Sequence, residues 1–415
     1  MRGAPVYILG GYQTDFARNW SKENKHIVAM MREAYQGSLE ATKIDPCDIE
    51  AAFVGNFGGE LYCMQAQLGA FFADLDPHFV GLPTCRFEAA CAASSTAVLS
   101  AMAFIQAGIY NLMCIIGIEQ MKTVSSNKGG DFLGTAGWQE KEAAGISLPF
   151  PKLFSDLANE YDKRYKLDDK YLARIAAINY GNAKRNPNAQ TRNWFMNFEH
   201  ANRVGKYNTV VAGKIRLTDC CQITDGAVCL YLASQEYATT YAKRIGCELS
   251  SIPRILGWGY TGAPIELAKK FADSEKSEYI LPWTRRAILD AYRRAGLENC
   301  WQLDVIETHD CFTITEYIEI EHFGLTEPGK SWQAIEEGVI EMQGRLPVNP
   351  SGGLIGCGHP VGATGARQLL DAYKQVTETA GQYQVPGAKR AAILNIGGTA
   401  TTNVCLIVGV GQERT

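Results

Sequence analysis

Arg86-Phe87-Glu88-Ala89-Ala90-Cys91-Ala92-Ala93-Ser94-Ser95-Thr96-Ala97 is the stretch around which this chain is organised. One cysteine stands among very small residues, and an apolar helical run follows it over residues 98–105. A strand, a sharp turn and a helix in this order would place the thiol at a helix N-terminus, where the macrodipole and free N–H groups favour the thiolate. A nucleophilic cysteine is built in this way, but a buried cysteine is more often a small hydrophobe in a packed helix. Both interpretations of Cys91 stay open from this stretch alone.

The composition is that of an ordinary globular protein. The chain has 415 residues, of which 46% are hydrophobic and 20% charged, and its net charge is -4. This length predicts two or three domains, each with its own core. The weakly acidic balance gives no reason to expect nucleic acid or a membrane surface as a partner. No apolar run reaches the roughly 18 residues that cross a bilayer.

The cysteines form neither a disulfide framework nor a zinc motif. There are 13 of them, an odd number, with irregular spacing and no C-x-x-C pair, so a reducing compartment is the default. Met1-Arg2-Gly3 leads directly into a strand-like segment, and the C-terminal Glu413-Arg414-Thr415 is not a peroxisomal signal. We therefore expect a cytoplasmic protein.

Strand-like and helical segments alternate through the first 121 residues. Residues 51–55 and 111–119 are apolar throughout, which is typical of strands covered on both faces by helices. Residues 26–43 and 65–75 have helical character. This alternation predicts an α/β fold.

The second part of the chain repeats this order. A strand, a helix and another strand follow one another at 304–307, 365–373 and 391–395. The spacings differ from those of the first part, so the repetition is one of topology. We predict two similar α/β halves with an active site at their junction.

The composition changes near Met121. The following stretch carries charge, asparagine, aromatic residues and prolines, and sheet character returns only at about residue 225. Its aromatic residues imply packing, so it is an insertion rather than a linker. We predict an N-terminal half formed by residues 1–121 and 219–260, an inserted loop domain at 122–218, and a C-terminal half at 261–415.

Two of the six histidines stand in unusual surroundings. His309 follows an apolar strand in Glu307-Thr308-His309-Asp310-Cys311-Phe312, where the loops of α/β sheets face ligands. In an extended segment His309 and Cys311 project to the same side. His359 stands within a segment, 352–365, that holds six glycines, which let a backbone approach a ligand closely. A glycine-rich structural turn explains the glycines but not the histidine at its apex.

A third glycine-bearing loop, Asn395-Ile396-Gly397-Gly398-Thr399, follows a buried strand and could present N–H groups to an oxyanion. No G-x-S-x-G elbow and no Walker lysine motif occur. Metal binding by the second-half thiols and histidines is conceivable, but their spacings are not those of zinc motifs. We predict no metal. The residues considered for such a site are His309, Cys311, Cys357 and His359.

In order and spacing, these segments resemble the thiolase superfamily over nearly the whole chain. The resemblance is carried by Cys91 in its small-residue setting, by Gly358-His359-Pro360-x-Gly362-Ala363-Thr364-Gly365 and by the terminal glycine loop. His309-Asp310-Cys311-Phe312 resembles the loop of the sterol-carrier-protein type of thiolase, where other thiolases carry Asn-Glu-Ala-Phe. The resemblance implies a thiolase-like α/β fold of two similar αβαβα halves with an inserted loop domain.

The resemblance also implies an activity in lipid and fatty acid metabolism. Such an acyltransferase moves an acyl group between acyl-CoA and CoA through a Cys91 acyl-enzyme, with Claisen condensation or thiolytic cleavage of a 3-ketoacyl-CoA. His359 takes the Cys91 proton, and the N–H groups of Cys91 and Gly397 hold the thioester oxyanion. His309 and His359 donate to the enolate oxygen of the second thioester.

One position departs from the usual thiolase pattern. Most thiolases begin the terminal glycine loop with a cysteine that serves as acid and base, and here that position is Asn395. In the sterol-carrier-protein type the His-Asp-Cys-Phe loop supplies this sulfur, so the resemblance implies Cys311 here. Cys357 is the alternative sulfur, although a small residue before a glycine explains it equally simply.

CoA is expected as a substrate, with no resident cofactor, and its site is expected in the insertion. The resemblance further implies a homodimer or homotetramer, with an accessory protein subunit as a possible partner. The rival functions are a β-ketoacyl synthase-like condensing enzyme and a non-catalytic thiolase-like subunit of a complex. An aldolase-like relative is disfavoured by the intact Cys91. Candidates for the CoA phosphates are Lys184, Arg185, Arg192, Arg203 and Lys206.

Overall fold

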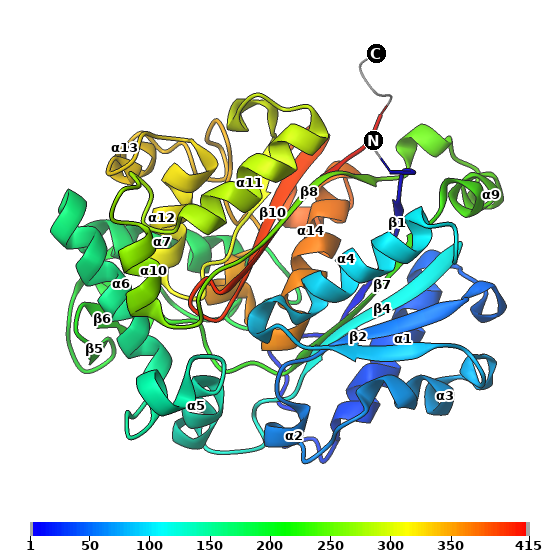
Figure 1. Cartoon of the computed structure of the whole chain (residues 1–415), viewed down its shortest axis with the longest axis horizontal. Coiled ribbons are helices and arrows are strands. Elements are labelled where there is room, and N and C mark those ends of the chain that lie inside the picture. Colours follow the sequence, from blue (N-terminus) through cyan, green and yellow to red (C-terminus); the bar gives the residue numbers. More distant parts are fainter. Residues whose placement is uncertain (1–2, 412–415) are drawn as a thin grey trace.

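The computed structural model describes residues 3–411, and one mixed sheet of nine strands runs through this part of the chain (Figure 1). The strand order is β3-β2-β4-β7-β1-β8-β11-β10-β9. The first half supplies β1 (Tyr7–Gln13), β2 (Ala51–Gly55), β3 (Thr84–Phe87), β4 (Leu112–Glu119) and β7 (Gly226–Ala233). The second half supplies β8 (Arg254–Gly262), β9 (Val305–Glu307), β10 (Arg390–Gly397) and β11 (Thr402–Gly409).

The two ends of the sheet are built alike. In the first half β2 and β4 run parallel, and β7 and then β1 follow antiparallel. In the second half β9 and β10 run parallel, and β11 and then β8 follow antiparallel. The halves meet where Tyr7 of β1 stands opposite Arg254 of β8. The predicted α/β class and the internal repetition are therefore confirmed.

Helices form three layers around the strands. Helices α1 (Ile27–Thr42) and α9 (Gln235–Ile245) share an apolar core with one face of the first-half strands. Helices α4 (Ala93–Gln106) and α14 (Thr364–Val376) lie between the strands of the two halves. Helices α11 (Pro282–Ala295) and α12 (Thr313–Phe323) belong to the core on the outer face of the second half. The five layers of the αβαβα order are therefore formed by both halves, with α4 and α14 as the central helical layer.

The segment between β4 and β7 contains the residues predicted to form an insertion. It packs on the second half, because Phe154 stacks on Phe312 with ring centroids 4.3 Å apart and the Tyr161 hydroxyl donates to Glu321 at 2.8 Å. This packing accounts for the aromatic residues of the segment, while its boundaries stay predictions. Its elements are α5 (Ser126–Gly134), α6 (Pro149–Tyr165), α7 (Lys170–Ala183), α8 (Phe198–Asn202), β5 (Val210–Ala212) and β6 (Ile215–Arg216).

One predicted helix is broken. Met64 and Gln67 have φ angles of 53° and 50°, a left-handed conformation that a side chain disfavours and a helix cannot contain. The expected helix at 65–75 is therefore a short 3₁₀ turn followed by the single-turn α3 (Phe72–Leu75). The remaining short helices are α2 (Gly59–Tyr62), α10 (Leu267–Asp273) and α13 (Ser331–Glu336).

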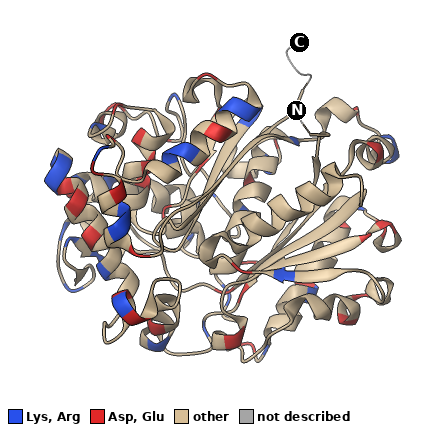
Figure 2. Cartoon of the chain, in the orientation of Figure 1, with Lys and Arg blue, Asp and Glu red and all other residues tan. Residues whose placement is uncertain are grey.

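Charged side chains gather on the outer helices (Figure 2), although a set of acidic and basic side chains is buried. Figure 2 shows Lys and Arg interspersed with Asp and Glu over the outer helices, while the central strands carry little charge. Within residues 3–411, no helix has the length and apolar character needed to cross a membrane. The terminal residues Met1-Arg2 and Glu413–Thr415, which entered the expectation of a cytoplasmic location, lie outside the described range.

Candidate active site

Cys91 lies where a strand turns sharply into a helix, as its surrounding sequence predicts. Strand β3 ends at Phe87, a single 3₁₀ turn spans Ala90–Ala92, and α4 follows. Ala90 has a φ of 50°, which is unfavourable for a residue with a side chain and marks a strained turn. Cys91 is only 6% exposed, because the small residues around it let other segments close over the sulfur.

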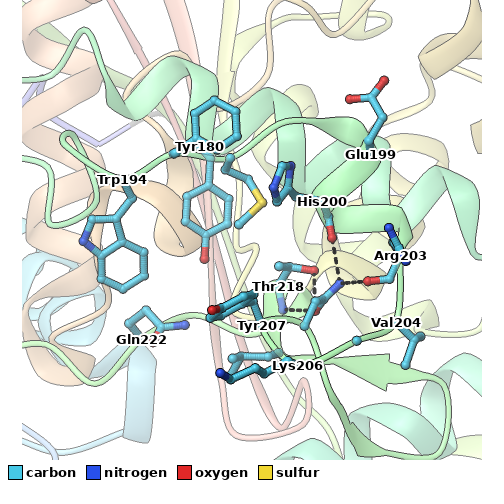
Figure 3. A pocket seen from close by; sticks show the side chains of 15 residues that line it. Tyr180, Trp194, Glu199, His200, Arg203, Val204, Lys206, Tyr207, Thr218 and Gln222 are labelled. Carbon is cyan, nitrogen blue, oxygen red and sulfur yellow. Dashed lines mark hydrogen bonds between the residues drawn. The ribbon is translucent and has the colours of Figure 1, made fainter.

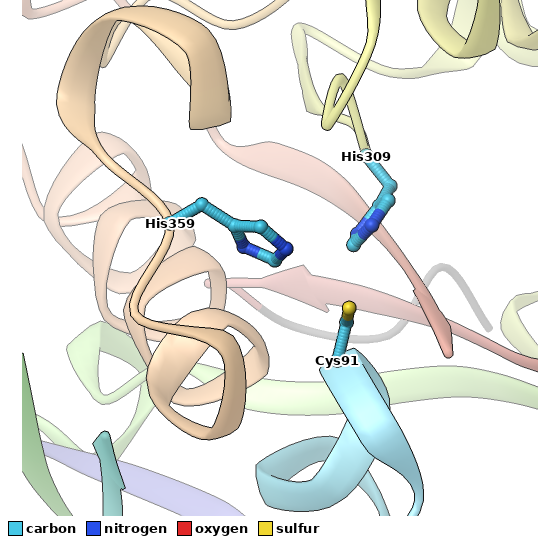
Figure 4. Close-up of side chains that lie close together, drawn as sticks. All are labelled: Cys91, His309 and His359. Atoms are coloured by element: carbon cyan, nitrogen blue, oxygen red, sulfur yellow. The ribbon is translucent and has the colours of Figure 1, made fainter. Parts of the chain in front are cut away.

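Two histidines from distant segments meet at this sulfur (Figure 4). The Cys91 Sγ and one ring nitrogen each of His309 and His359 lie within 4.8 Å of one another. His309 comes from the loop after β9, and His359 from the loop before α14. Their rings are 5.3 Å apart at an interplanar angle of 86°. The junction of the halves therefore gathers three of the five predicted site residues around one point.

The hydrogen bonds of His359 leave its Nε2 free to accept a proton. Its Nδ1 lies 2.7 Å from the Thr364 hydroxyl. Thr364 gives its own proton to the Pro360 carbonyl oxygen at 3.1 Å, so this hydroxyl accepts from Nδ1–H. In the neutral ring the proton is then on Nδ1, and Nε2 carries a lone pair. His359 is thus prepared to act as a base.

His309 has the opposite arrangement. The Asn395 side-chain amide donates to its Nδ1 at 3.2 Å, and the Ser95 hydroxyl donates to the Asn395 oxygen at 2.7 Å. With Nδ1 as acceptor, the ring proton is on Nε2, which is buried and has no hydrogen-bond partner. His309 therefore presents an unused N–H group, suited to an oxygen that develops negative charge.

Burial keeps all three groups neutral. It lowers the pKa of His359 to about 3 and that of His309 well below its usual value. Burial raises the pKa of Cys91 to about 12, although a hydrogen bond from the Gly398 backbone opposes the shift. The expectation that the helix N-terminus favours the thiolate is therefore not met in the resting site, because desolvation outweighs the donors. The thiol must lose its proton during the reaction.

A second N–H group of the terminal glycine loop is directed at the Cys91 sulfur. Gly398, which has a φ of 63°, gives its N–H to this sulfur, whereas Gly397 is the donor predicted for the thioester oxygen. Gly397 stands at the end of β10, so close to the Ala89 carbonyl oxygen that a side chain would collide with it.

The two candidate second sulfurs lie in different places. Cys311 lines the same cavity as Cys91 and His359, a space of about 270 Å³. Cys357 is fully buried outside that lining and lies near the side-chain amides of Gln13 and Asn186, at 3.9 and 3.5 Å. The remaining lining of the cavity is mainly apolar and includes Met121, Leu133, Leu148, Phe150, Phe312 and Val361.

Buried carboxyl groups hold the loops in position, and sequence reasoning missed them. Asp310 accepts the backbone N–H groups of Leu354 and Ile355 at 2.6 and 3.2 Å, and so ties the His309 loop to the glycine segment. Glu119 accepts the N–H groups of Phe57 and Gly362 at 2.8 and 3.0 Å. An acidic residue at the end of an apolar strand is the sequence feature that could have indicated them, because solvent is not expected there.

Cys91, His309 and His359 are also residue types that bind zinc. A tetrahedral zinc with bonds of about 2.0–2.3 Å needs its ligand atoms roughly 3.5 Å apart, and these atoms lie within 4.8 Å. A bound cation would occupy the thiol and the lone pair of His359. We assign no metal to the site.

Comparison with known proteins identifies the family. The model described as "Thiolase, N-terminal domain" matches residues 6–197, and the one described as "Thiolase C-terminal domain-like" matches residues 266–410. The chain belongs to the thiolase family. The resemblance read from the Cys91 stretch, the Gly-His-Pro segment and the terminal glycine loop is thereby confirmed.

Relatives of this thiolase carry related names. An acetyl-CoA acetyltransferase of Methanothermobacter thermautotrophicus is 31% identical over 96% of this chain and 97% of the relative. Sterol carrier protein 2 of Gallus gallus is 28% identical over 94% of this chain and 69% of the relative. These relatives support acyl transfer over the β-ketoacyl synthase and non-catalytic alternatives, so this thiolase is an acyltransferase.

Solved structures agree on the fold. The Ltp2-ChsH2(DUF35) aldolase superposes with a TM-score of 0.78 at 19% identity and covers all of both chains. Human mitochondrial 3-ketoacyl-CoA thiolase in complex with CoA gives a TM-score of 0.68 at 15% identity, covering 99% of this chain and 98% of that one. The predicted thiolase-like fold is thus confirmed.

Proposed function

We propose that this thiolase forms its acyl-enzyme on Cys91 with His359 as the base. The observation that carries the proposal is the meeting of one thiol and two imidazole nitrogens within 4.8 Å. The Cys91 proton moves to the lone pair of His359 while Sγ attacks the thioester carbonyl of an acyl-CoA. The carbon–sulfur bond to CoA then breaks, and the departing sulfur takes the proton back from His359. One thioester replaces another, so the step balances.

Backbone N–H groups stabilise the tetrahedral oxyanion of this step. Those of Cys91 and Gly397 are the proposed donors to the oxygen. The Gly398 N–H, which donates to the thiol, holds the sulfur as charge builds on it. Each donor to a developing oxyanion contributes about 2–4 kcal/mol to catalysis.

In the second half-reaction Cys311 gives its proton to His359, and the Cys311 thiolate removes an α-proton from the acetyl group of another acyl-CoA. The Nε2–H of His309, and His359 in its protonated form, donate to the enolate oxygen. The α-carbon attacks the acyl-enzyme carbonyl, the bond to Cys91 breaks, and the Cys91 sulfur takes the proton held by His359. Thiolytic cleavage of a 3-ketoacyl-CoA is the reverse sequence. Cys311 is favoured over Cys357 because only Cys311 lines the cavity of Cys91.

Three alanine variants test these roles. Cys91→Ala should form no acyl-enzyme with labelled acetyl-CoA, and a fully active variant would sink the proposal. Cys311→Ala should still form the acyl-enzyme but lose most Claisen and thiolysis activity. Cys357→Ala is the matched control, since it removes a sulfur that is equally buried. If Cys357→Ala instead forms the acyl-enzyme but loses Claisen and thiolysis activity, Cys357 and not Cys311 is the acid and base.

CoA is proposed to enter along the insertion, through a cavity of about 730 Å³ (Figure 3). This cavity shares Leu217 and Gln222 with the cavity of Cys91, so a long substrate can reach from one to the other. Tyr207 is 81% exposed at its rim, as suits an aromatic that stacks on a nucleobase. Arg203 and Lys206 supply positive charge there.

The other basic candidates line a different space. Lys184, Arg185 and Arg192 border a separate cavity of about 410 Å³. Arg192 is moreover paired with Asp15, at 2.7 and 2.9 Å. The proposed phosphate ligands are therefore narrowed to Arg203 and Lys206.

We further propose a homodimer formed through the free edge of β3. This strand ends the sheet and pairs only with β2 among the described strands, and an unpaired edge is a template for a second copy. An accessory subunit is proposed by analogy with the Ltp2-ChsH2(DUF35) aldolase, whose name includes two proteins. The cysteines of the described structure are all free, which suits the proposed cytoplasmic location.

A further inference from the structure

Lys270 is a buried lysine that no step above uses. It lies on α10 and is 2% exposed, whereas lysines are almost never fully buried without a charged partner. Its Nζ donates to three oxygens: the Thr399 hydroxyl at 2.7 Å, the Thr401 hydroxyl at 2.9 Å and the Ile265 carbonyl at 3.1 Å. None of the ion pairs found within residues 3–411 involves this nitrogen, although the neighbouring Lys269 pairs with Glu266.

The surroundings of Lys270 make its charge costly. Burial lowers its pKa to about 7, and Glu142 of the insertion is the acidic group that opposes this shift. The side of α11 that faces it contributes Pro282, Trp283 and Thr284, none of them charged. A methionine would fill a similar volume without this cost. The polar contacts of Lys270 therefore call for a reason other than packing.

Two of those contacts are to the terminal glycine loop, which lies next to Cys91. Thr399 and Thr401 follow Gly398, whose N–H donates to the Cys91 sulfur. Lys270 is the hydrogen-bond partner found for both hydroxyls. The loop contains two left-handed residues, Gly398 and Ala400, each with a φ of 63°, so it needs anchoring to hold that conformation.

The insertion reaches the same loop from the other side. Glu142 accepts the N–H of Leu267 at the start of α10, at 2.7 Å. The Ala136 carbonyl oxygen lies so close to Gly398 that a side chain there would approach it at 2.9 Å. The loop is therefore held between the insertion and α10, and Lys270 supplies its hydrogen bonds on the α10 side.

We propose that Lys270 is a positioning residue for thiol catalysis: through Thr399 and Thr401 it fixes the Gly397–Gly398 donors against Cys91 and the oxygen of its thioester. This inference rests on the proposed role of Cys91 as nucleophile. Misplaced donors weaken stabilisation of the transition state more than binding of CoA, which lies along the insertion. Loss of Lys270 therefore lowers kcat while KM stays nearly constant.

The first test compares neighbouring lysines. Lys270→Met should lower kcat by about tenfold or more, with KM for acetyl-CoA changed by less than about twofold. It should also slow the alkylation of Cys91 by iodoacetamide. Lys269→Met is the matched control, because Lys269 is exposed on the same helix and pairs with Glu266 at 3.4 Å. Equal kinetics in the two variants would overturn the proposal.

A second pair of variants decides the matter if Lys270→Met does not fold. Thr399→Val removes the hydroxyl and keeps the shape, whereas Thr399→Ser keeps the hydroxyl. The valine variant should lose kcat and alkylation rate, and the serine variant should retain both. Valine and serine variants with the same rates would refute the anchoring role. A wild-type enzyme that forms no Cys91 acyl-enzyme would instead refute the proposed function, so the two failures are distinguishable.

Discussion

His309 and His359 are neutral in opposite tautomers. The proton of His309 is on Nε2, whereas the proton of His359 is on Nδ1. Their rings lie 5.3 Å apart, edge to face. The Thr364 hydroxyl accepts from one ring, and the Asn395 amide donates to the other. His359 therefore offers a lone pair and His309 an N–H group, although both rings are neutral and fully buried or nearly so. Thr364 and Asn395 therefore determine which ring nitrogen of each histidine carries the proton.

Asn395→Leu should separate the two half-reactions. The substitution removes the amide that fixes His309 with its proton on Nε2, and the leucine has a similar volume. We expect acyl-enzyme formation from acetyl-CoA to continue, because His359 and Thr364 are unchanged. Condensation should fall by roughly tenfold or more, because the N–H donor to the enolate oxygen is no longer fixed. Rapid-quench measurement of acylation beside steady-state condensation checks this.

Ser95→Ala is the control for Asn395→Leu. It removes the hydroxyl that donates to the Asn395 oxygen but leaves the amide that donates to His309, so its effect should be the smaller. If Asn395→Leu slows acylation as much as condensation, the amide orients the whole site and the tautomer argument fails.

The resting Cys91 thiol should show no thiolate–imidazolium pair. Its pKa is raised to about 12 by burial, and that of His359 is lowered to about 3. Between pH 7 and 9 the thiolate fraction then grows about tenfold per pH unit, and so should the alkylation rate of Cys91. Peptide mass spectrometry distinguishes Cys91 from the exposed Cys47 and Cys85. A rate that is constant over this range would indicate a preformed ion pair.

The residues that meet at the candidate site are easier to predict from sequence than the residues that hold them in position. Cys91 and His359 stand in short motifs whose composition is unusual in itself, so they can be found without neighbours. Asn395 is visible only as a departure from a pattern, because its partners Ser95 and His309 are 300 and 86 residues away. Lys270 gives no signal, since its burial depends on a loop that begins more than 120 residues later.

The same limit applies to charges. The insertion offers several basic residues that look equivalent in sequence, and only the folded chain assigns Lys184 and Arg203 to different cavities. The alternation of apolar segments, by contrast, is a local property. It predicts the α/β class and the buried strands, whereas the half-exposed, four-residue edge strand β3 is expected only as the strand that leads into the Cys91 turn.

Glu316 should make stability fall as the pH rises. It is fully buried and accepts the amides of Asn179 and Asn349 at 2.6 and 2.7 Å. Burial, and then the nearby Asp310, raise its pKa to about 8. From about pH 4.5 upward the unfolded chain ionises this carboxyl while the folded protein keeps it protonated until about pH 8. The folded state is therefore destabilised by up to about 1.4 kcal/mol per pH unit in that window.

Glu316→Gln tests this sign. Glutamine is neutral at every pH, so the variant lacks that contribution. Urea denaturation at pH 5, 6, 7 and 8 should show the stability of the variant rising relative to the wild type as the pH increases. The other buried acids are present in both proteins, so the comparison cancels their contribution to the pH dependence of the free energy of unfolding. A difference that is constant over this pH range would mean that Glu316 is ionised in the fold.

Arg203→Ala should raise KM for CoA by about tenfold with little change in kcat, because a phosphate contact remote from the reacting atoms contributes binding alone. Lys184→Ala removes a cation of the same insertion from a cavity that does not adjoin the Cys91 cavity, and KM should stay constant. Raised salt should weaken CoA binding to the wild type more than to Arg203→Ala, since screening acts on the contact that the variant lacks. A KM effect confined to Lys184→Ala would contradict this assignment. It would place the CoA phosphates in the cavity of Lys184 and Arg185. The acyl-CoA would then have to approach Cys91 from the α14 side.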